Sequence, residues 1–159
     1  MSDTDDNGAK QVCTFLLDGL LFGVDVGCVQ EVIRYQEMTP VPLAAAVVGG
    51  LINLRGRIVT ALDMRTRLQL APRAPGQLPV NVVVRHEEGV VSLLVDEIGD
   101  VVDVDDASAE LPPETLPASA KALITSVYKL EPQLLLLLDS RLATRVENLN
   151  FGKRTSNVN

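Results

Sequence analysis

The chain has 159 residues, enough for one domain or two small ones, and its 47% content of hydrophobic residues excludes wholesale disorder. Its formal net charge of −7 argues against nucleic acid as the main partner, because nucleic-acid binding requires a basic surface. The polar, acidic N-terminus does not match a secretory signal peptide, and the longest apolar run, 134–138, is far too short to cross a bilayer. We therefore expect a cytoplasmic protein.

The first half of the chain is expected to form five short strands. Apolar runs rich in β-branched residues alternate there with turn signals, a pattern typical of strands. These strands are predicted at 12–17, 20–26, 29–35, 47–54 and 58–62. A segment rich in proline and glycine, 70–79, then connects this half to the second one.

The segment 47–68 is the most informative part of the first half. It reads VVGGLINLRGRIVTALDMRTRL, in which two apolar runs flank a polar turn at 53–57, so it is predicted to form a β-hairpin. Asp63 is positioned to cap a following helical turn that would hold Met64 and Leu68 on one face. A hairpin needs a polar turn and a glycine, but it does not require this particular string of residues.

The second half repeats the strand pattern. Strands are predicted at 80–84, 90–95, 101–104, 122–127 and 134–138. A short C-terminal helix is predicted from Asp139 to about Glu147, because Leu142 and Val146 then fall one turn apart.

Five short strands in each half favour an all-β fold of two small β-barrels, because a barrel leaves few exposed strand edges. The predicted division places the barrels at about 11–75 and 76–149, with the first strand free to cross between them, inside a single domain of residues 11–149. Residues 1–10 and 150–159 are expected to be loose tails.

A weak internal repeat supports this two-part architecture. Three short segments of the first half recur in the same order in the second half. The matches pair 24–25 with 95–96, 29–32 with 98–101, and 62–65 with 138–141. Short matches among common residues arise by chance, but their preserved order favours two related halves.

Groups that could carry out catalysis or bind a metal are scarce. His86, the sole histidine, lies beside acidic residues in an apparent turn, and the two cysteines, Cys13 and Cys28, are interpreted as buried thiols that act as small hydrophobes. The glycine pair at 49–50 indicates tight packing or a turn, since no phosphate-loop motif surrounds it. We expect no enzyme activity, no metal and no cofactor. An acidic series lacks the glycine and terminal glutamate of an EF-hand loop and is interpreted as a solvated strand edge: Asp100, Asp103, Asp105 and Asp106.

Three residues are candidates for a protein-binding surface. Taken alone, Arg55 at the hairpin tip is interpreted as an exposed turn residue in preference to a binding anchor. Glu31 is interpreted as one end of a surface ion pair, and Val29 as a core residue.

Charge is unevenly distributed between the predicted halves. Residues 11–75 carry six basic and five acidic side chains, a net of +1, whereas residues 76–148 carry five basic and thirteen acidic ones, a net of −8. Two readings remain open. The difference either favours docking in one orientation, with a basic partner surface opposite the acidic half, or simply keeps the protein soluble.

Five segments together resemble the CheW family, the adaptors of bacterial chemosensory arrays. In chain order they read FGVDVGCVQEVI, MTPVP, VVGGLINLRGRIVTALDM, VVSLLVDEIGDVV and LLLLLDSRL. The resemblance runs from about Val12 to Val146. It implies two SH3-like five-stranded β-barrels without catalytic activity. It also implies that the protein links the cytoplasmic tips of chemoreceptors to the regulatory domain of a CheA-type histidine kinase, at receptor arrays on the inner membrane.

The resemblance also implies two sets of contact residues. In the receptor set, an apolar groove would accept a helix hairpin while Arg55 and Glu31 fix its register. The receptor contacts implied by motif position are Val29, Glu31, Gly50 and Arg55. The kinase contacts expected in the second half are Val95, Ile98, Gly99 and Val101.

Three departures from the family pattern leave the fold expectation intact. Thr60 stands where proline is common, Met64 where leucine is common, and Ser126 where glycine is common. No receiver-domain sequence follows, which disfavours the adaptor–receiver fusion CheV, and the chain is too short to be the kinase. The alternatives from other classes are a small acidic β-barrel that binds single-stranded nucleic acid and a hydrolase with an unrecognised site. The acidic, aromatic-poor composition disfavours the first, and the single histidine disfavours the second.

Overall fold

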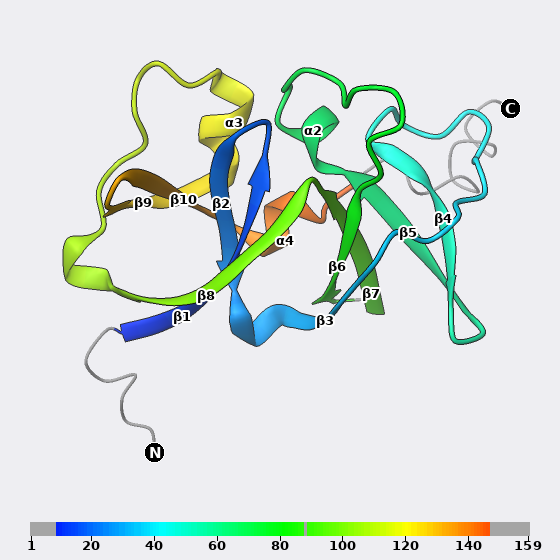
Figure 1. Ribbon diagram of the computed structural model, residues 1–159, viewed down its shortest axis with the longest axis horizontal. Coiled ribbons are helices and arrows are strands. Elements are labelled where there is room, and N and C mark those ends of the chain that lie inside the picture. The colour runs from blue at the N-terminus through cyan, green and yellow to red at the C-terminus, as the bar shows by residue number, and fades with distance from the viewer. Residues whose placement is uncertain (1–8, 88, 147–159) are drawn as a thin grey trace, which may run out of the picture.

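The computed structural model describes residues 9–87 and 89–146, which form ten strands and three short helices (Figure 1). The strands are β1 (Ala9–Leu17), β2 (Leu20–Asp25), β3 (Val29–Ile33), β4 (Val48–Leu54), β5 (Arg57–Asp63), β6 (Val80–His86), β7 (Gly89–Val95), β8 (Glu97–Asp105), β9 (Ile124–Leu130) and β10 (Gln133–Leu138). The helices are α2 (Met64–Arg67), α3 (Ala118–Leu123) and α4 (Ser140–Ala143). Two single 3₁₀ turns lie at Val26–Cys28 and Asp106–Ser108.

All ten predicted strands are confirmed, with ends that differ by a few residues. The predicted strand at 122–127 begins only at Ile124, because the residues before it form α3, which the strand pattern does not indicate. The predicted C-terminal helix is shorter than expected, since α4 ends at Ala143, and Glu147 lies outside the described residues. The first two residues of β1, at 9–10, were expected to belong to a tail.

The ten strands form two five-stranded sheets. One sheet, called barrel A here, has the order β8-β1-β2-β10-β9, and the other, barrel B, has the order β3-β6-β7-β5-β4. The predicted division near residue 75 is therefore corrected, because β1 and β2 join β8–β10 while β6 and β7 join β3–β5. The chain crosses from barrel A to barrel B after Asp25 and returns after Val95.

The sheet orders confirm the internal repeat. If β1–β5 are renumbered as β6–β10, and β6–β10 as β1–β5, the strand order of barrel A becomes that of barrel B. The matched segments occupy equivalent places, since 62–65 ends β5 and begins α2 while 138–141 ends β10 and begins α4. Asp63 and Asp139 each cap the following helix, by accepting a hydrogen bond from the backbone N–H two residues ahead.

The outer strands of each sheet are brought together by two backbone hydrogen bonds. Beyond β3, the N–H of Thr39 donates to the carbonyl of Leu51 in β4 at 2.8 Å, and the N–H of Leu51 donates back at 2.9 Å. Beyond β8, Glu110 and Val127 in β9 exchange the same pair of bonds, at 2.8 and 2.9 Å. Edge groups that would otherwise be unpaired are thereby satisfied, as expected for SH3-like sheets.

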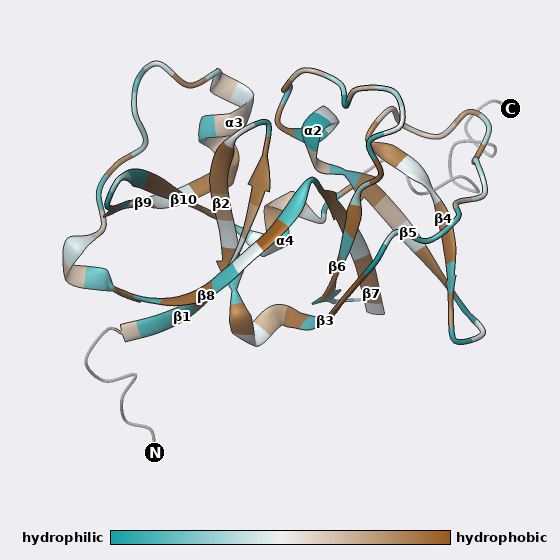
Figure 2. Ribbon diagram, viewed as in Figure 1, coloured by the Kyte–Doolittle hydropathy of each residue, from teal (hydrophilic) through white to brown (hydrophobic). Residues whose placement is uncertain are grey.

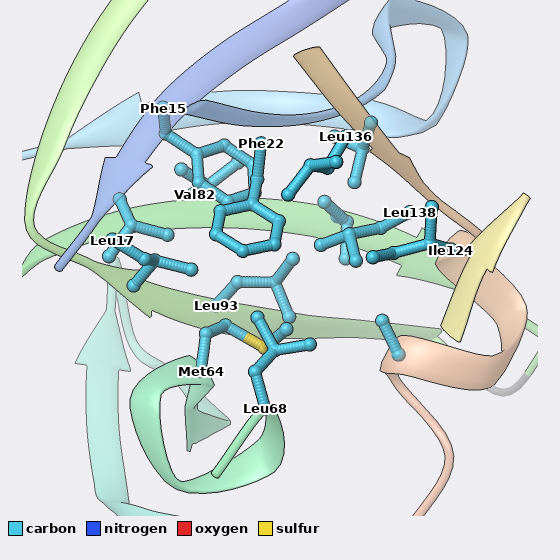
Figure 3. Packing of buried hydrophobic residues seen from close by; sticks show 14 of the residues in the cluster. Phe15, Leu17, Phe22, Met64, Leu68, Val82, Leu93, Ile124, Leu136 and Leu138 are labelled. Atoms are coloured by element: carbon cyan, nitrogen blue, oxygen red, sulfur yellow. The ribbon is translucent and has the colours of Figure 1, made fainter. Parts of the chain in front are cut away.

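Buried side chains form three clusters, and the largest joins the two barrels. Figure 2 shows hydrophobic residues along the inner strands β2 and β7. In Figure 3, side chains from both sheets and from the α2 turn meet in this shared cluster; those labelled are Phe15, Leu17, Phe22, Met64, Leu68, Val82, Leu93, Ile124, Leu136 and Leu138. The interior of barrel A is filled around Val12, Tyr128 and Leu135, and that of barrel B around Ile52 and Val59.

An ion cluster lies where the chain returns from barrel B to barrel A. The carboxylate of Asp96 accepts hydrogen bonds from Arg65 Nη2 at 2.6 Å and Nε at 3.1 Å, and from Arg73 Nε at 3.0 Å. The side chains of Asp96, Arg65 and Arg73 are only 8%, 9% and 10% exposed. The backbone N–H of Asp18, in the turn between β1 and β2, donates to the same carboxylate at 2.8 Å. We call these four residues the Asp96 cluster.

Candidate protein-binding surface

Barrel B carries all four residues predicted for receptor contact. Val29 and Glu31 lie on β3, Gly50 lies on β4, and Arg55 lies in the turn between β4 and β5. Strands β3 and β4 are the two outer strands of the sheet. Residues that are about 20 positions apart in the sequence are thus placed on the two edges that meet beside this turn.

Arg55 and Glu31 form a bidentate ion pair across these edges. Nη1 of Arg55 donates to Oε2 of Glu31 and Nη2 donates to Oε1, both at 2.6 Å. The Arg55 side chain is 69% exposed, whereas that of Glu31 is 21% exposed. Hydrogen bonding to Arg55 lowers the pKa of Glu31, so its carboxylate stays ionised. The predicted surface ion pair at Glu31 is confirmed, and a partner at this edge meets paired charges.

The backbone of the NLRG motif explains how Arg55 is presented. Arg55 and Gly56 both have positive φ, 55° and 84°, as a two-residue type I′ hairpin turn requires. Oδ1 of Asn53 accepts a hydrogen bond from the N–H of Gly56 at 2.8 Å, which fixes the turn. The predicted hairpin is confirmed, and its tip projects the Arg55 side chain into solvent.

Gly50 has a structural role that the family resemblance does not indicate. Its φ is +153°, and an added Cβ would lie 2.9 Å from Cβ of Met38 and 3.0 Å from the carbonyl oxygen of Thr39. The glycine therefore permits the chain beyond β3 to lie against β4. Since Gly50 is buried, the expectation of a direct contact is corrected: it shapes the surface from beneath.

Gly50→Ala is expected to lower the free energy of unfolding by about 1–3 kcal/mol, the usual cost of overpacking, because Met38 and Thr39 must move away from β4. Urea denaturation followed by circular dichroism measures this loss. Gly56→Ala is the matched control, since Gly56 also has a positive φ and so carries backbone strain, whereas nothing lies within 4 Å of an added Cβ there. Equal losses in both variants would contradict the packing explanation.

The remaining apolar surface of barrel B was only partly predicted. Val29 packs against the shared core cluster, in agreement with its interpretation as a core residue. Val32, the next apolar residue on β3, is 40% exposed, and Ile58, just after the hairpin turn, is 64% exposed. Successive side chains of a strand point to opposite faces, so the sequence of β3 already indicates that Val32 faces away from its buried side. Only the three-dimensional position of the hairpin shows that Ile58 reaches solvent.

The predicted kinase contacts divide between core and surface. Ile98 and Val101 are 41% and 53% exposed on β8, an outer strand of barrel A. Val95 is fully buried at the end of β7, so its prediction as a contact is corrected: its side chain belongs to the shared core. An added Cβ on Gly99 would lie 2.5 Å from Oγ1 of Thr14, so this glycine allows β8 to pass closely over a bulge beside β1.

The cysteines are placed in and beside the shared core. Cys13 is buried, as predicted, while Cys28 is half-buried, and burial raises the pKa of both thiols. Among residues 9–87 and 89–146, no three His, Cys, Asp or Glu side chains group closely enough to hold a metal ion. Within the same residues, none of the helices has the length and apolar character needed to span a membrane.

Comparison with known proteins identifies the family of this double barrel. Residues 11–146 match the family model of the CheW-like domain. The chain belongs to the CheW-like domain family. The match includes all the strands except the first two residues of β1, so the CheW-like domain comprises both barrels.

Relatives of this CheW-like chain carry the same name in several bacteria. The chemotaxis protein CheW of Rhizobium meliloti (strain 1021) is 29% identical over 133 residues, which cover 84% of this chain and 86% of that protein. The chemotaxis protein CheW of Bacillus subtilis (strain 168) is 27% identical over 131 residues, or 82% and 84% of the two chains. The crystal structure of the scaffolding protein TtCheW from Thermoanaerobacter tengcongensis has the same fold, with a TM-score of 0.76, 24% identity, and coverage of 87% and 90%.

Proposed function

We propose that the chain is a non-enzymatic adaptor that links chemoreceptors to a CheA-type histidine kinase in a bacterial chemosensory array. The observation that carries this proposal is the CheW-like family match, which extends over both barrels. The names of the relatives, chemotaxis protein CheW and scaffolding protein TtCheW, support an adaptor. The protein would work in the cytoplasm and reach the inner membrane only through its receptors.

The two barrels offer different surfaces for the two partners. We assign receptor contact to the edge of barrel B that carries the Arg55–Glu31 pair, with Val29 and Val32 beside it. A receptor helix would lay its apolar face along β3 and find its register from the ion pair. We assign kinase contact to β8 of barrel A, where Ile98 and Val101 are exposed.

The alternative of nucleic-acid binding is not supported by the comparisons. The segments that build barrel A, 9–25 and 96–146, hold five basic and twelve acidic residues, a net of −7. The segment 26–95, which contains barrel B, holds seven basic and five acidic residues, a net of +2. The net negative charge of barrel A would repel a phosphate backbone. The net charge of +2 on the segment that contains barrel B is too small to form the basic groove that nucleic-acid binding requires.

The Arg55→Ala variant tests the proposed function. In a reconstituted mixture of receptor, CheA-type kinase and this protein, the wild type is expected to raise receptor-dependent kinase phosphorylation, and the variant is expected to lose most of this stimulation. The loss follows because the turn no longer presents the guanidinium of Arg55, and Glu31 no longer has its partner. Arg57→Ala is the matched control, since Arg57 lies just beyond the same turn.

Stimulation by the wild type and by Arg57→Ala, but not by Arg55→Ala, supports both the adaptor function and the receptor surface. If all three proteins stimulate equally, the adaptor function holds and Arg55 is removed from the surface. An absence of stimulation and of binding by the wild type, with the cognate kinase and receptor, overturns the adaptor function.

The charge of barrel A leads to a separate prediction about the kinase. Asp100→Lys combined with Asp103→Lys reverses two exposed charges on β8. We expect kinase affinity to fall by about tenfold at low salt and by less at high salt, since complementary charges chiefly steer association. Titration calorimetry at two salt concentrations measures the effect. Glu114→Lys with Glu131→Lys changes the net charge equally, away from β8; an equal loss there would show that only net charge matters.

A further inference from the structure

The two places where the chain crosses between the barrels are equivalent in topology but differ in chemistry. Asp25 ends β2 before the crossing to barrel B, and Asp96 follows β7 at the crossing back to barrel A. The internal repeat pairs these two aspartates with each other, and it pairs Arg65 with Arg141. The same two residue types therefore stand at both crossings, and they are engaged differently.

At the Asp96 crossing, both arginines of the cluster are anchored to barrel B. Nη1 of Arg73 donates to Oδ1 of Asp63 at 3.1 Å, and Nη2 donates to the carbonyl of Leu94 at 3.0 Å. Nη1 of Arg65 donates to the carbonyl of Ala71 at 2.8 Å. Each guanidinium group is thus held by hydrogen bonds to barrel B or to the loop that follows α2, in addition to its hydrogen bonds with Asp96.

Barrel A approaches the same carboxylate through its β1–β2 turn. The N–H of Asp18 donates to Asp96, and the N–H of Asp96 donates to the carbonyl of Leu16 at 3.0 Å. Asp18 itself has a φ of +53°, and its carboxylate lies 3.7 Å from Nη1 of Arg65. The carboxylate of Asp96 is therefore the point at which groups fixed to barrel A and groups fixed to barrel B converge.

The Asp25 crossing has no such cluster. The carboxylate of Asp25 accepts a hydrogen bond from the N–H of Gly27, at 2.8 Å, and so caps the local 3₁₀ turn. Arg141 is exposed, and neither residue takes part in an ion pair with another residue of the described chain. Among the residues that the structure describes, a buried ionic contact therefore occurs only at the Asp96 crossing.

We propose that the Asp96 cluster holds barrels A and B in one relative orientation, and that Asp96 is a positioning residue for the adaptor. The shared apolar core favours contact between the barrels, but hydrophobic burial has no directional preference. Buried charges are stable only when their hydrogen bonds are satisfied, so they favour the one arrangement that satisfies them. The receptor surface on barrel B and the kinase surface on barrel A would consequently keep a fixed geometry.

Residual dipolar couplings measured by NMR test the orientation directly, without any partner. In the wild type, the couplings of both barrels should fit one alignment tensor of equal magnitude. In Asp96→Asn, we expect the two barrels to need tensors that differ in orientation or magnitude. Asp25→Asn is the matched control at the equivalent crossing; asparagine can cap the same turn, so one tensor should suffice. A single tensor in Asp96→Asn would overturn the proposal.

Arg73→Gln serves as a second variant in case Asp96→Asn does not fold. It removes one of the two arginines while leaving the contacts between Arg65 and Asp96 intact. Two different tensors in this variant would support the proposal. If Asp96→Asn does not fold, a single tensor in Arg73→Gln would overturn the proposal.

The consequence for signalling rests on the proposed adaptor function. In the reconstituted assay, folded Asp96→Asn should bind receptor and kinase separately, yet its receptor-dependent stimulation should fall by roughly tenfold, within the usual range of coupling between sites. A merely structural role predicts equal loss of binding and stimulation. Normal stimulation by Asp96→Asn overturns the positioning role, whereas failure of the wild type to bind either partner overturns the adaptor function and leaves the dipolar couplings to decide the orientation.

Discussion

Asp96→Asn is expected to lower the free energy of unfolding by about 3 kcal/mol, at the lower end of the range for breaking a buried ion pair. The substitution leaves the guanidinium groups of Arg65 and Arg73 buried without their shared counter-charge. Asparagine keeps nearly the same volume and can still accept a hydrogen bond from the N–H of Asp18, which limits the loss. Urea denaturation at neutral pH measures the difference.

The pH dependence of this difference has a definite sign. Burial disfavours the charged form of Asp96, but the hydrogen bonds from Arg65 and Asp18 and the charges of Arg65 and Arg73 outweigh it, so its pKa is lowered. The ionised carboxylate therefore stabilises the fold above the unfolded pKa of about 3.9. This contribution is lost as the pH falls through the lower, folded pKa, so the wild type and Asp96→Asn should converge in stability in strong acid.

Asp103→Asn on the exposed side of β8 is the matched control, with an expected change within about 0.5 kcal/mol because the site is solvated. If Asp96→Asn and Asp103→Asn were equally mild, or if the loss from Asp96→Asn were the same at pH 7 and in strong acid, the ion cluster would not stabilise the fold as described.

Replacing both exposed apolar residues of β8 by serine, Ile98→Ser with Val101→Ser, is expected to weaken kinase binding by about 30-fold, or about 2 kcal/mol. These side chains are 41% and 53% exposed on an outer strand. Because most of their exposed neighbours on β8 are acidic, they are the main apolar groups that the strand offers to a partner. Surface plasmon resonance with the kinase regulatory domain gives the affinity. We expect the change to appear mainly in the dissociation rate.

The control for this pair is Leu134→Ser on β10. Leu134 is 40% exposed, close to the value for Ile98, and belongs to the same barrel. If its substitution weakens kinase binding as much as the pair on β8, the contact is not confined to β8. Unchanged affinity in the β8 pair would remove that strand from the kinase surface.

The local elements were predictable because short-range chemistry specifies them. Alternating apolar residues and turn signals gave all ten strands, and the string NLRG gave a turn whose two positive φ angles suit its sequence. The capping role of Asp63 followed from its place just before a helical turn. Each of these features depends on residues within a few positions of one another.

Sheet membership and burial were less predictable because they depend on distant pairings. Nothing near β6 in the sequence indicates that it pairs with β3 and not with β1, so the division near residue 75 was wrong. Val95 and Gly50 have the residue types and motif positions of family contacts, yet packing buries both. The Asp96 cluster joins residues up to 78 positions apart, a distance at which no spacing rule applies.

The crossed strand order also affects how the chain can acquire its fold during synthesis. All the strands of barrel B lie between Val29 and Val95, so this barrel has its complete sequence well before translation reaches the end of the domain. Barrel A needs β1 and β2 from the beginning of the domain and β10, which ends at Leu138. Its first hairpin therefore lacks β10, the strand that pairs with β2, until more than a hundred further residues have been added, and during that interval the chain is exposed to misfolding and aggregation.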